Sequence, residues 1–199
     1  MSSLGAHEVL ELHEVLNDAI HGLNTLNLFR PYAQDHMLQA IMDRHIQVLT
    51  MEYNSMVQLA NQQGAGQAVP ARRMSAGMNP AINMNQTFQP MYGLHNPQTQ
   101  APARSAQEID DVDVALCLVN CHKQTASLKM KAALEMANPT LRRTMQHGAN
   151  TSADMAYEGF QFANQKGYYQ VPTLKDTTQN TYLQSYGMSQ THQTDIPMV

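Results

Sequence analysis

Residues 138–169 read NPTLRRTMQHGANTSADMAYEGFQFANQKGYY and contain the signals of one complete helix. Asn138 is a favourable N-cap and Pro139 suits the first helical position, while Gly167 can adopt the left-handed conformation that closes a helix. Seven inward positions, three or four residues apart, are small or apolar: Leu141, Met145, Gly148, Ser152, Met155, Gly159 and Phe162. A glycine inside a helix costs about 1 kcal/mol relative to alanine. The two glycines on this face therefore predict a close approach to a neighbouring helix.

The end of this predicted helix is repeated earlier in the chain. Residues 163–167 read ANQKG and residues 60–64 read ANQQG, so the two segments differ at one position. The chain is therefore predicted to contain the same helical hairpin twice, once over residues 1–64 and again over residues 105–172.

The first hairpin has clear signals for two helices. The seam of the first helix, within residues 7–29, is Val9, Leu12, Leu16, Ala19, Leu23 and Leu26. Pro31 should end this helix because proline lacks an N–H and crowds the preceding turn. Asp35 can cap a second helix that runs to about Gln63, and Gly64 should stop it. The inner positions of the second helix are Leu38, Ile41, His45, Val48, Glu52, Met56 and Leu59.

Two residues of that inner stripe, His45 and Glu52, are polar where a bundle helix normally carries apolar side chains. They either pair with each other inside the bundle or bind a ligand, because buried polar groups normally have partners. A di-metal centre in such a bundle requires a Glu from two helices and an E-x-x-H motif from the other two, and the chain has no E-x-x-H. Glu14, His45 and Glu52 supply at most half of that site. The second hairpin offers three more residues without the required spacing: His122, His147 and Glu158.

The connection between the hairpins, residues 65–104, is a low-complexity linker with five prolines among Gly, Gln, Asn and Met. It is slightly basic and is expected to lie along an acidic helix face. It is long enough to run the length of a bundle, so the third helix can start at either end. Ser105 to Glu108 has the S-x-x-E form of a capping box and predicts the start of the third helix, which continues to about Ala137. Its predicted seam is Ile109, Val112, Leu116, Val119, Ala126, Met130, Ala133 and Ala137, with Lys123 as an interruption.

The third helix carries both cysteines, Cys117 and Cys121, one turn apart beside the apolar seam. C-x-x-x-C is not the spacing of a zinc ribbon or of a redox C-x-x-C motif. We interpret them as half-buried packing thiols. The alternative function is cross-linking between subunits once oxidants reach the protein.

The chain ends in a polar tail over residues 173–199, rich in Gln, Thr and Ser. From Tyr168 onward, this composition predicts disorder for the isolated molecule. Four tyrosines in this region either anchor a neighbouring molecule or return to cover the bundle: Tyr168, Tyr169, Tyr182 and Tyr186.

The overall composition argues against several functions. A net charge of −4, with 12 Lys and Arg in 199 residues, does not provide the concentrated basic face that nucleic acids require. The first residues lack a basic start and a continuous apolar run, so we expect cytosolic synthesis and no membrane span. No phosphate-binding glycine loop and no G-x-S-x-G motif are present in the sequence. We therefore expect no enzymatic activity, no catalytic residue and no cofactor.

The second hairpin resembles the spore coat protein F family of endospore-forming bacteria. The resemblance rests on the acidic start at Asp110 and Asp111, the N-P-x-L-R turn at 138–142 and the K-G-Y-Y ending at 166–169. It covers residues 110–172 well and residues 7–64 weakly. The family often has a His-Glu pair midway along its last helix, where this chain has Ala156, Tyr157 and Glu158, and the linker here is unusually long.

The resemblance implies an all-α, ferritin-like four-helix bundle that serves as a coat component of the dormant spore, with no established chemistry. The implied location is the spore coat, after synthesis in the mother-cell cytoplasm. The implied partners are the protein itself, as a homo-oligomer or polymer, and other coat proteins. The alternative is a metal-binding or oxidative bundle enzyme that uses His45, Glu52 and the polar stripe of the first helix. This stripe consists of His7, Glu11, Glu14, Asp18 and His21. A third hypothesis is an adaptor that binds one partner through the linker.

Overall fold

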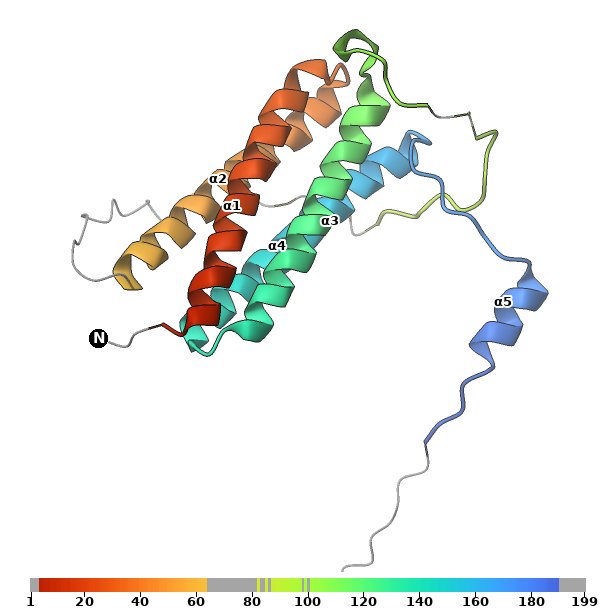
Figure 1. Ribbon diagram of the computed structural model, residues 1–199. Coiled ribbons are helices and arrows are strands. Elements are labelled where there is room, and N and C mark those ends of the chain that lie inside the picture. Colours follow the sequence, from red (N-terminus) through yellow and green to blue (C-terminus); the bar gives the residue numbers. More distant parts are fainter. Residues whose placement is uncertain are drawn as a thin grey trace, which may run out of the picture.

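The computed structural model describes residues 4–63, 82, 85, 87–97, 99 and 101–189, and the α-helices in this part of the chain number five. Their bounds are α1 Ala6–Phe29, α2 His36–Gln63, α3 Asp111–Glu135, α4 Pro139–Gln165 and α5 Asp176–Leu183, with 3₁₀ turns η1 Arg30–Tyr32 and η2 Ala106–Glu108 (Figure 1). Over these residues the only β-type pairing is a pair of isolated bridges from Val171 to Tyr92 and Gly93. The predicted all-α class is confirmed for the described residues.

Several predicted helix ends are confirmed by their capping bonds. The Asp35 carboxylate accepts hydrogen bonds from the N–H groups of Met37 (2.7 Å) and Leu38 (3.3 Å) and so caps α2. The Asn138 side chain accepts from Thr140 (2.9 Å) and Leu141 (3.2 Å) and caps α4. Pro31 lies in η1, immediately after α1, and Gly167 has the expected positive φ of 76° after α4. Gly64, predicted to stop α2, lies outside the described residues.

The predicted start of the third helix is wrong. Ser105 makes no side-chain capping bond, and residues 106–108 form only the short turn η2. The Glu108 carboxylate binds Arg104 instead (2.8 Å), so it does not complete a capping box. The true cap is Asp110, whose carboxylate accepts from Val112 (2.9 Å) and Asp113 (3.2 Å). The helix also ends at Glu135, slightly before the predicted Ala137.

Two contacts between distant residues fix the directions of the helices. The Gln34 N–H donates to the Asp111 carboxylate (2.7 Å), which places the α1–α2 turn beside the start of α3. The Asn138 N–H donates to the Glu8 carboxylate (2.6 Å), which places the start of α1 beside the α3–α4 turn. Helices α2 and α3 therefore run in the same direction, so the end of α2 and the start of α3 lie at opposite ends of the bundle (Figure 1).

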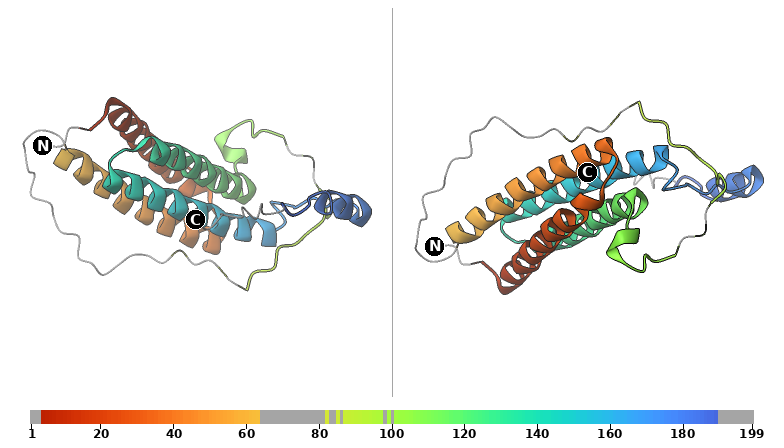
Figure 2. Two further views of the ribbon diagram at one scale, coloured as in Figure 1. Left: turned by 90° about the horizontal axis from the view of Figure 1, so that it is seen from below. Right: turned by 90° about the horizontal axis from the view of Figure 1, so that it is seen from above.

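Helices α1 to α4 lie side by side and share a buried core, seen from below and above in Figure 2. One part of the core includes Leu26, Met42, Leu118 and Phe162, and a second part lies nearer the α3–α4 turn. All seven inward positions predicted for α4 are buried. The predicted close approach is confirmed at Gly159, where a Cβ atom would lie 3.0 Å from Val119 Cγ2.

The predicted seam of α3 is correct only at Val119 and Ala133, because the buried face of the helix is rotated relative to the predicted pattern. Its buried residues are Val114, Ala115, Leu118, Val119, His122, Thr125, Lys129, Ala132 and Ala133. Met130, predicted to face inward, is 40% exposed, whereas Lys129 is buried. The first helix shows the same effect on a smaller scale, since Glu8 is buried and Val9 is exposed. A pattern search that rejects polar residues cannot find a face that contains them.

The chain after α4 folds back before it leaves the bundle. Tyr168 packs on Phe162 (ring centroids 6.1 Å apart) and Tyr169 packs on Phe160 (5.3 Å), so these two tyrosines cover the bundle. The following residues form α5, which the sequence did not predict. Among the described residues α5 contacts no other helix, and it projects away from the bundle (Figure 1). No helix in the described ranges is both long and apolar enough to cross a membrane.

Candidate functional site

A chain of three polar side chains crosses the interior of the bundle and joins α2, α3 and α4. His45 Nδ1 lies 3.0 Å from His122 Nε2, and His45 Nε2 lies 2.8 Å from a carboxylate oxygen of Glu158. Both histidines are fully buried, and Glu158 is nearly so. The second carboxylate oxygen of Glu158 binds the Arg44 guanidinium, which is partly exposed at the edge of the bundle.

The ionised carboxylate sets the direction of the hydrogen bonds in this chain. A carboxylate only accepts, so His45 Nε2 carries a hydrogen and donates it to Glu158. A neutral His45 then presents Nδ1 as an acceptor, and His122 donates to it from Nε2. This assignment leaves His122 Nδ1 as a bare lone pair, and among the described residues this buried atom has no hydrogen-bond partner.

The burial of these groups determines their charge. Burial is the main cause that lowers the pKa of His45, although the hydrogen bond and charge of Glu158 act in the opposite direction. Burial also holds the pKa of His122 well below its ordinary value, and the charges of His45 and Lys129 act in the same direction. Burial alone would raise the pKa of Glu158, but the hydrogen bond from His45 and the charge of Arg44 outweigh it and leave the pKa lowered. At neutral pH the site therefore contains two neutral imidazoles and one carboxylate paired with Arg44.

A second polar contact lies two helical turns further along the same helices. Lys129 Nζ lies 2.7 Å from the Glu52 carboxylate and 3.2 Å from Ser152 Oγ, and the lysine side chain is 1% exposed. Gly148 makes room for this ion pair, because a Cβ atom there would come within 2.2 Å of Glu52 Oε1. The predicted role of Gly148 in close packing thus has a specific cause, which is the space occupied by a buried ion pair.

The structure separates the residues that the sequence suggested as partners. The expected contact between His45 and Glu52 is not formed, because seven residues span about 10 Å along a helix and side chains of α3 and α4 occupy the space beside each. Glu14 is exposed on α1 and lies in neither cluster. Within the described ranges, no group of three or more His, Cys, Asp or Glu side chains is arranged to hold a metal ion. His147 is also exposed, whereas His122 and Glu158 both belong to the buried chain.

The residues that sequence reasoning missed in these polar contacts include Arg44, Lys129 and Thr125. Thr125 Oγ1 donates to the Asp18 carboxylate (2.8 Å) and so connects α3 to α1. One signal for the Lys129 contact was present in the sequence. His45 and Glu52 are seven residues apart on α2, and their partners His122 and Lys129 are seven residues apart on α3. The His45–His122 contact and the Glu52–Lys129 contact therefore both join residues 77 positions apart in the chain.

The cysteines lie outside this polar chain, on the side of α3 that faces α1. Both are free and half-buried, and Cys121 Sγ lies 3.5 Å from the position of a Cβ atom on Gly22. Burial raises the pKa of Cys117, and burial together with the charges of Cys117 and Asp18 raises the pKa of Cys121 to about 11. At neutral pH both are therefore thiols, which react slowly with oxidants. This environment favours a packing role.

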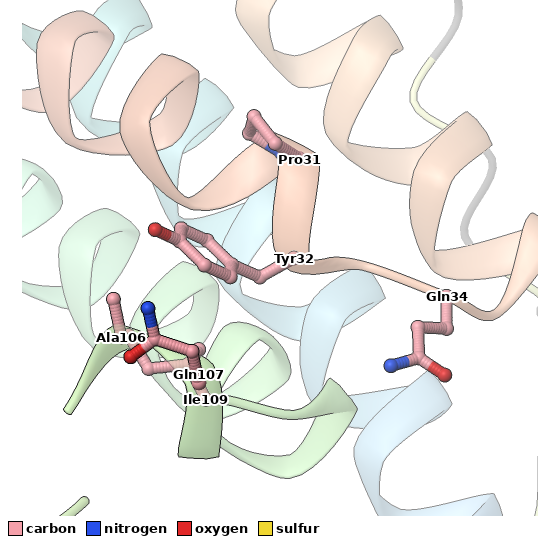
Figure 3. Close-up of a pocket in the computed structure, with 6 residues that line it drawn as sticks. All are labelled: Pro31, Tyr32, Gln34, Ala106, Gln107 and Ile109. Carbon is pink, nitrogen blue, oxygen red and sulfur yellow. The ribbon is translucent and has the colours of Figure 1, made fainter. Parts of the chain in front are cut away.

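A shallow pocket of about 230 Å³ lies at the end of the bundle where α1 turns into α2. Figure 3 shows its lining side chains, which come from the α1–α2 turn on one side and from η2 and the following residues on the other: Pro31, Tyr32, Gln34, Ala106, Gln107 and Ile109. These provide one phenol, two amides and aliphatic groups. They include no charged side chain.

Comparison with known proteins identifies relatives of the chain. Residues 110–172 match the Coat F domain. The chain is also 31% identical over 175 residues to the spore coat protein F-like protein YhcQ of Bacillus subtilis (strain 168), an alignment that covers 85% of this chain and 74% of that protein. No solved structure matches the chain.

Proposed function

The chain belongs to the Coat F family, and we propose that it is a structural component of the bacterial endospore coat that acts by self-assembly or by docking on other coat proteins. The observation that carries this proposal is the similarity to a spore coat protein F-like protein over most of both chains. The proposed location is the spore coat, after synthesis in the mother-cell cytoplasm. The proposed role is not enzymatic.

The arrangement of the helices supports a ferritin-like bundle as the framework. Helix α1 is antiparallel to α2, a long connection leads to α3 in the same direction as α2, and α4 is antiparallel to α3. One long crossover between two hairpins is the connectivity of ferritin-like folds. The two hairpins are proposed to form one bundle, with residues 65–104 as the crossover and 173–199 as the tail.

The buried polar residues support a structural role rather than a metal centre. In a di-metal bundle, cations neutralise the inward carboxylates. Here the Lys129 ammonium neutralises Glu52, and Arg44 with His45 satisfies Glu158. The alternative metal-binding or oxidative function would require these partners to separate before a metal could bind. Near-stoichiometric iron or manganese after dialysis of the purified protein would establish that alternative.

The exposed tail supplies surface for assembly contacts. Tyr182 and Tyr186 are 64% and 85% exposed, and Leu183 beside them is 68% exposed. Tyrosine is enriched at protein interfaces, because its ring is apolar and its hydroxyl group can form a hydrogen bond. Tyr168 and Tyr169 instead pack on the bundle, so we propose that Tyr182 and Tyr186 make the intermolecular contacts among the four candidates.

Electron microscopy of the purified protein at increasing concentration tests self-assembly. We expect ordered polymers from the natural sequence and fewer polymers from the double variant Tyr182→Ser with Tyr186→Ser. A matched variant with phenylalanine at both positions keeps the rings and should assemble normally. The coat location is tested separately, by looking for the protein in the coat fraction of purified spores. Persistent monomers would oppose self-assembly, and absence from the coat fraction would overturn the coat proposal.

A further inference from the structure

The connection between α2 and α3 is held against α4 by side-chain amides that bind its backbone. The Gln161 amide accepts a hydrogen bond from the Asn85 N–H (3.2 Å) and donates one to the Asn85 carbonyl (3.1 Å). Asn164 accepts from the Met91 N–H (2.7 Å) and donates to the Met91 carbonyl (3.1 Å). Both amide side chains are at least 95% buried. Each forms a two-point clamp that recognises the backbone of the bound segment.

A third clamp and a β-type bridge bind the same connection through residues that follow α4. Gln170 accepts from the His95 N–H (2.7 Å) and donates to the His95 carbonyl (3.2 Å). Between these points, the Gly93 N–H donates to the Val171 carbonyl (2.8 Å). We call the held residues, Asn85 and 87–97, the strap. Figure 1 shows the strap, in yellow-green, crossing the blue segment that follows α4.

One aromatic side chain of the strap packs against two stacked rings of α4. Phe88 makes edge contacts with Tyr157 and Phe160, with ring centroids 6.3 Å and 6.1 Å apart. Phe160 in turn contacts Tyr169. We call the groups that hold the strap the strap site. It consists of the three side-chain amides that bind the strap backbone and the aromatic rings that contact Phe88.

The other large side chains of the strap contribute little burial. Met91, Tyr92 and Leu94 are 44%, 63% and 59% exposed. The strap is thus held chiefly by hydrogen bonds to its backbone and by Phe88. Such a segment can leave its site without opening the apolar core, because none of the core residues belongs to it.

We propose that the strap site is an assembly interface, in which the strap of one molecule occupies the clamps of a second copy of the same chain. This inference rests on the proposed self-assembly and names the surface and the segment that carry it. A second copy supplies the same backbone and the same phenylalanine, so every contact described above can form between molecules. Exchange of identical elements between protomers is an established route from monomer to oligomer.

The lengths of the flanking segments permit the exchange. Residues 64–84 separate α2 from the strap and residues 98–110 separate the strap from α3, and fully extended chains of these lengths reach at most about 75 Å and about 45 Å, so the second segment limits the exchange. The intramolecular strap competes with an effective concentration of about 1 mM. At about 100 µM protein, the intermolecular form should reach about one-tenth of the intramolecular form, and it should dominate at the higher concentrations of an assembled layer.

Disulfide trapping between two differently tagged proteins tests the exchange. In a Cys117→Ala, Cys121→Ala background, one full-length protein carries Tyr92→Cys and the other carries Val171→Cys. These positions are bridge partners, so their Cα atoms are about 5 Å apart, within the range that a disulfide requires. After mixing and mild oxidation, we expect a disulfide-linked heterodimer that contains both tags. Its yield should rise with protein concentration.

Two controls separate exchange from random collision. Asn54 is exposed on α2, so Asn54→Cys mixed with the Tyr92→Cys protein measures collision alone. Adding Asn164→Ala to the Val171→Cys protein removes one clamp and should reduce the heterodimer toward the collision level. Thermal unfolding of each variant establishes that it is folded. A heterodimer yield no higher than the collision control would overturn the proposal.

A single chain that carries both Tyr92→Cys and Val171→Cys provides the complementary test. When oxidised, its strap is locked within the molecule, and we expect it to remain monomeric at concentrations at which the natural sequence forms polymers. Reduction should restore assembly. If the locked chain polymerises as well as the natural sequence does, strap exchange is wrong and self-assembly stands. If the natural sequence forms neither polymers nor heterodimers, both the exchange and the self-assembly fail.

Discussion

Mild acid is expected to destabilise the protein through its buried histidines. His45 and His122 have lowered pKa values in the folded state because burial disfavours the imidazolium form. In the unfolded chain the ordinary value is about 6.5. Below that pH, the unfolded state binds more protons than the folded state, so the free energy of unfolding falls as the pH falls. The loss of stability from the two histidines is negligible above about pH 7.5 and grows progressively as the pH falls through 6.5.

The size of the effect follows from this difference in proton binding. For His122, whose pKa is well below the ordinary value, acidification from pH 6.5 to 5.5 should remove about 1 kcal/mol. His45 adds to this loss, to a total of up to about 2 kcal/mol over the first unit. Glu158 does not contribute in this window, because its pKa is lowered from 4.5 and its carboxylate stays ionised.

Urea unfolding at pH 7.5, 6.5 and 5.5 measures this dependence. In the variant His122→Gln, the glutamine amide can still donate to His45 but cannot take up a proton. The loss of stability between pH 6.5 and 5.5 should therefore be about 1 kcal/mol smaller than in the natural protein. His147→Gln, at an exposed position, serves as the matched control and should leave the dependence unchanged. Equal stability at pH 7.5 and 5.5, or an unchanged dependence in His122→Gln, would refute the reasoning.

Three further predictions concern the core and the thiols. Lys129→Met leaves the Glu52 carboxylate without its cation and should lower the free energy of unfolding in urea by about 3–5 kcal/mol. The double variant with Glu52→Leu should recover most of that free energy. Gly148→Ala should destabilise the protein by about 1–3 kcal/mol despite the better helix propensity of alanine, because its Cβ displaces the Glu52 carboxylate; a gain in stability would contradict this. Cys121 should react with a thiol reagent at pH 8 about 100-fold more slowly in the folded than in the unfolded protein, and Cys117 should also react more slowly. Assembled material should give the same monomer band with and without reductant.

The fourth helix could be predicted from the sequence because several independent signals agree there. Asn138, Pro139 and Gly167 act through local backbone chemistry, which does not depend on the rest of the fold. The small and apolar residues between them recur at the helical period, so both the ends and the buried face were correct. The same local reasoning succeeded for the Asp35 cap of α2.

The third helix shows where such reasoning fails. Ser105 and Glu108 have the form of a capping box, but Asp110 and Asp113 form a second capping box a few residues later. Which of the two begins the helix depends on the contact of Asp111 with the α1–α2 turn. That contact joins residues far apart in the chain and leaves no local signal. The buried face was missed because its members include His122, Thr125 and Lys129, whose burial is favourable only with partners from other helices.

The candidate site was only partly visible in the sequence. His45 and Glu52 stood out as polar residues within an apolar stripe, and both are indeed held by polar partners. The identity of those partners depends on the relative position of α2 and α3, which a long connection does not determine. The strap clamps were not visible either, because Gln161 and Asn164 bind backbone atoms and any sequence supplies those.

The two buried polar contacts give a physical answer to how α2 and α3 find their relative position. Short turns set the alignment within each hairpin, but the connection over residues 64–110 leaves the two hairpins free to slide. A shift of one heptad in one direction would place His45 opposite Lys129 and leave Glu52 without a cation. A shift in the other direction would place Lys129 opposite Leu59, with a buried, unpaired ammonium. Since an unpaired buried charge costs several kcal/mol, both shifted arrangements are strongly disfavoured. The polar residues therefore specify one alignment of the bundle, in the way that a single buried polar residue fixes the register of a coiled coil.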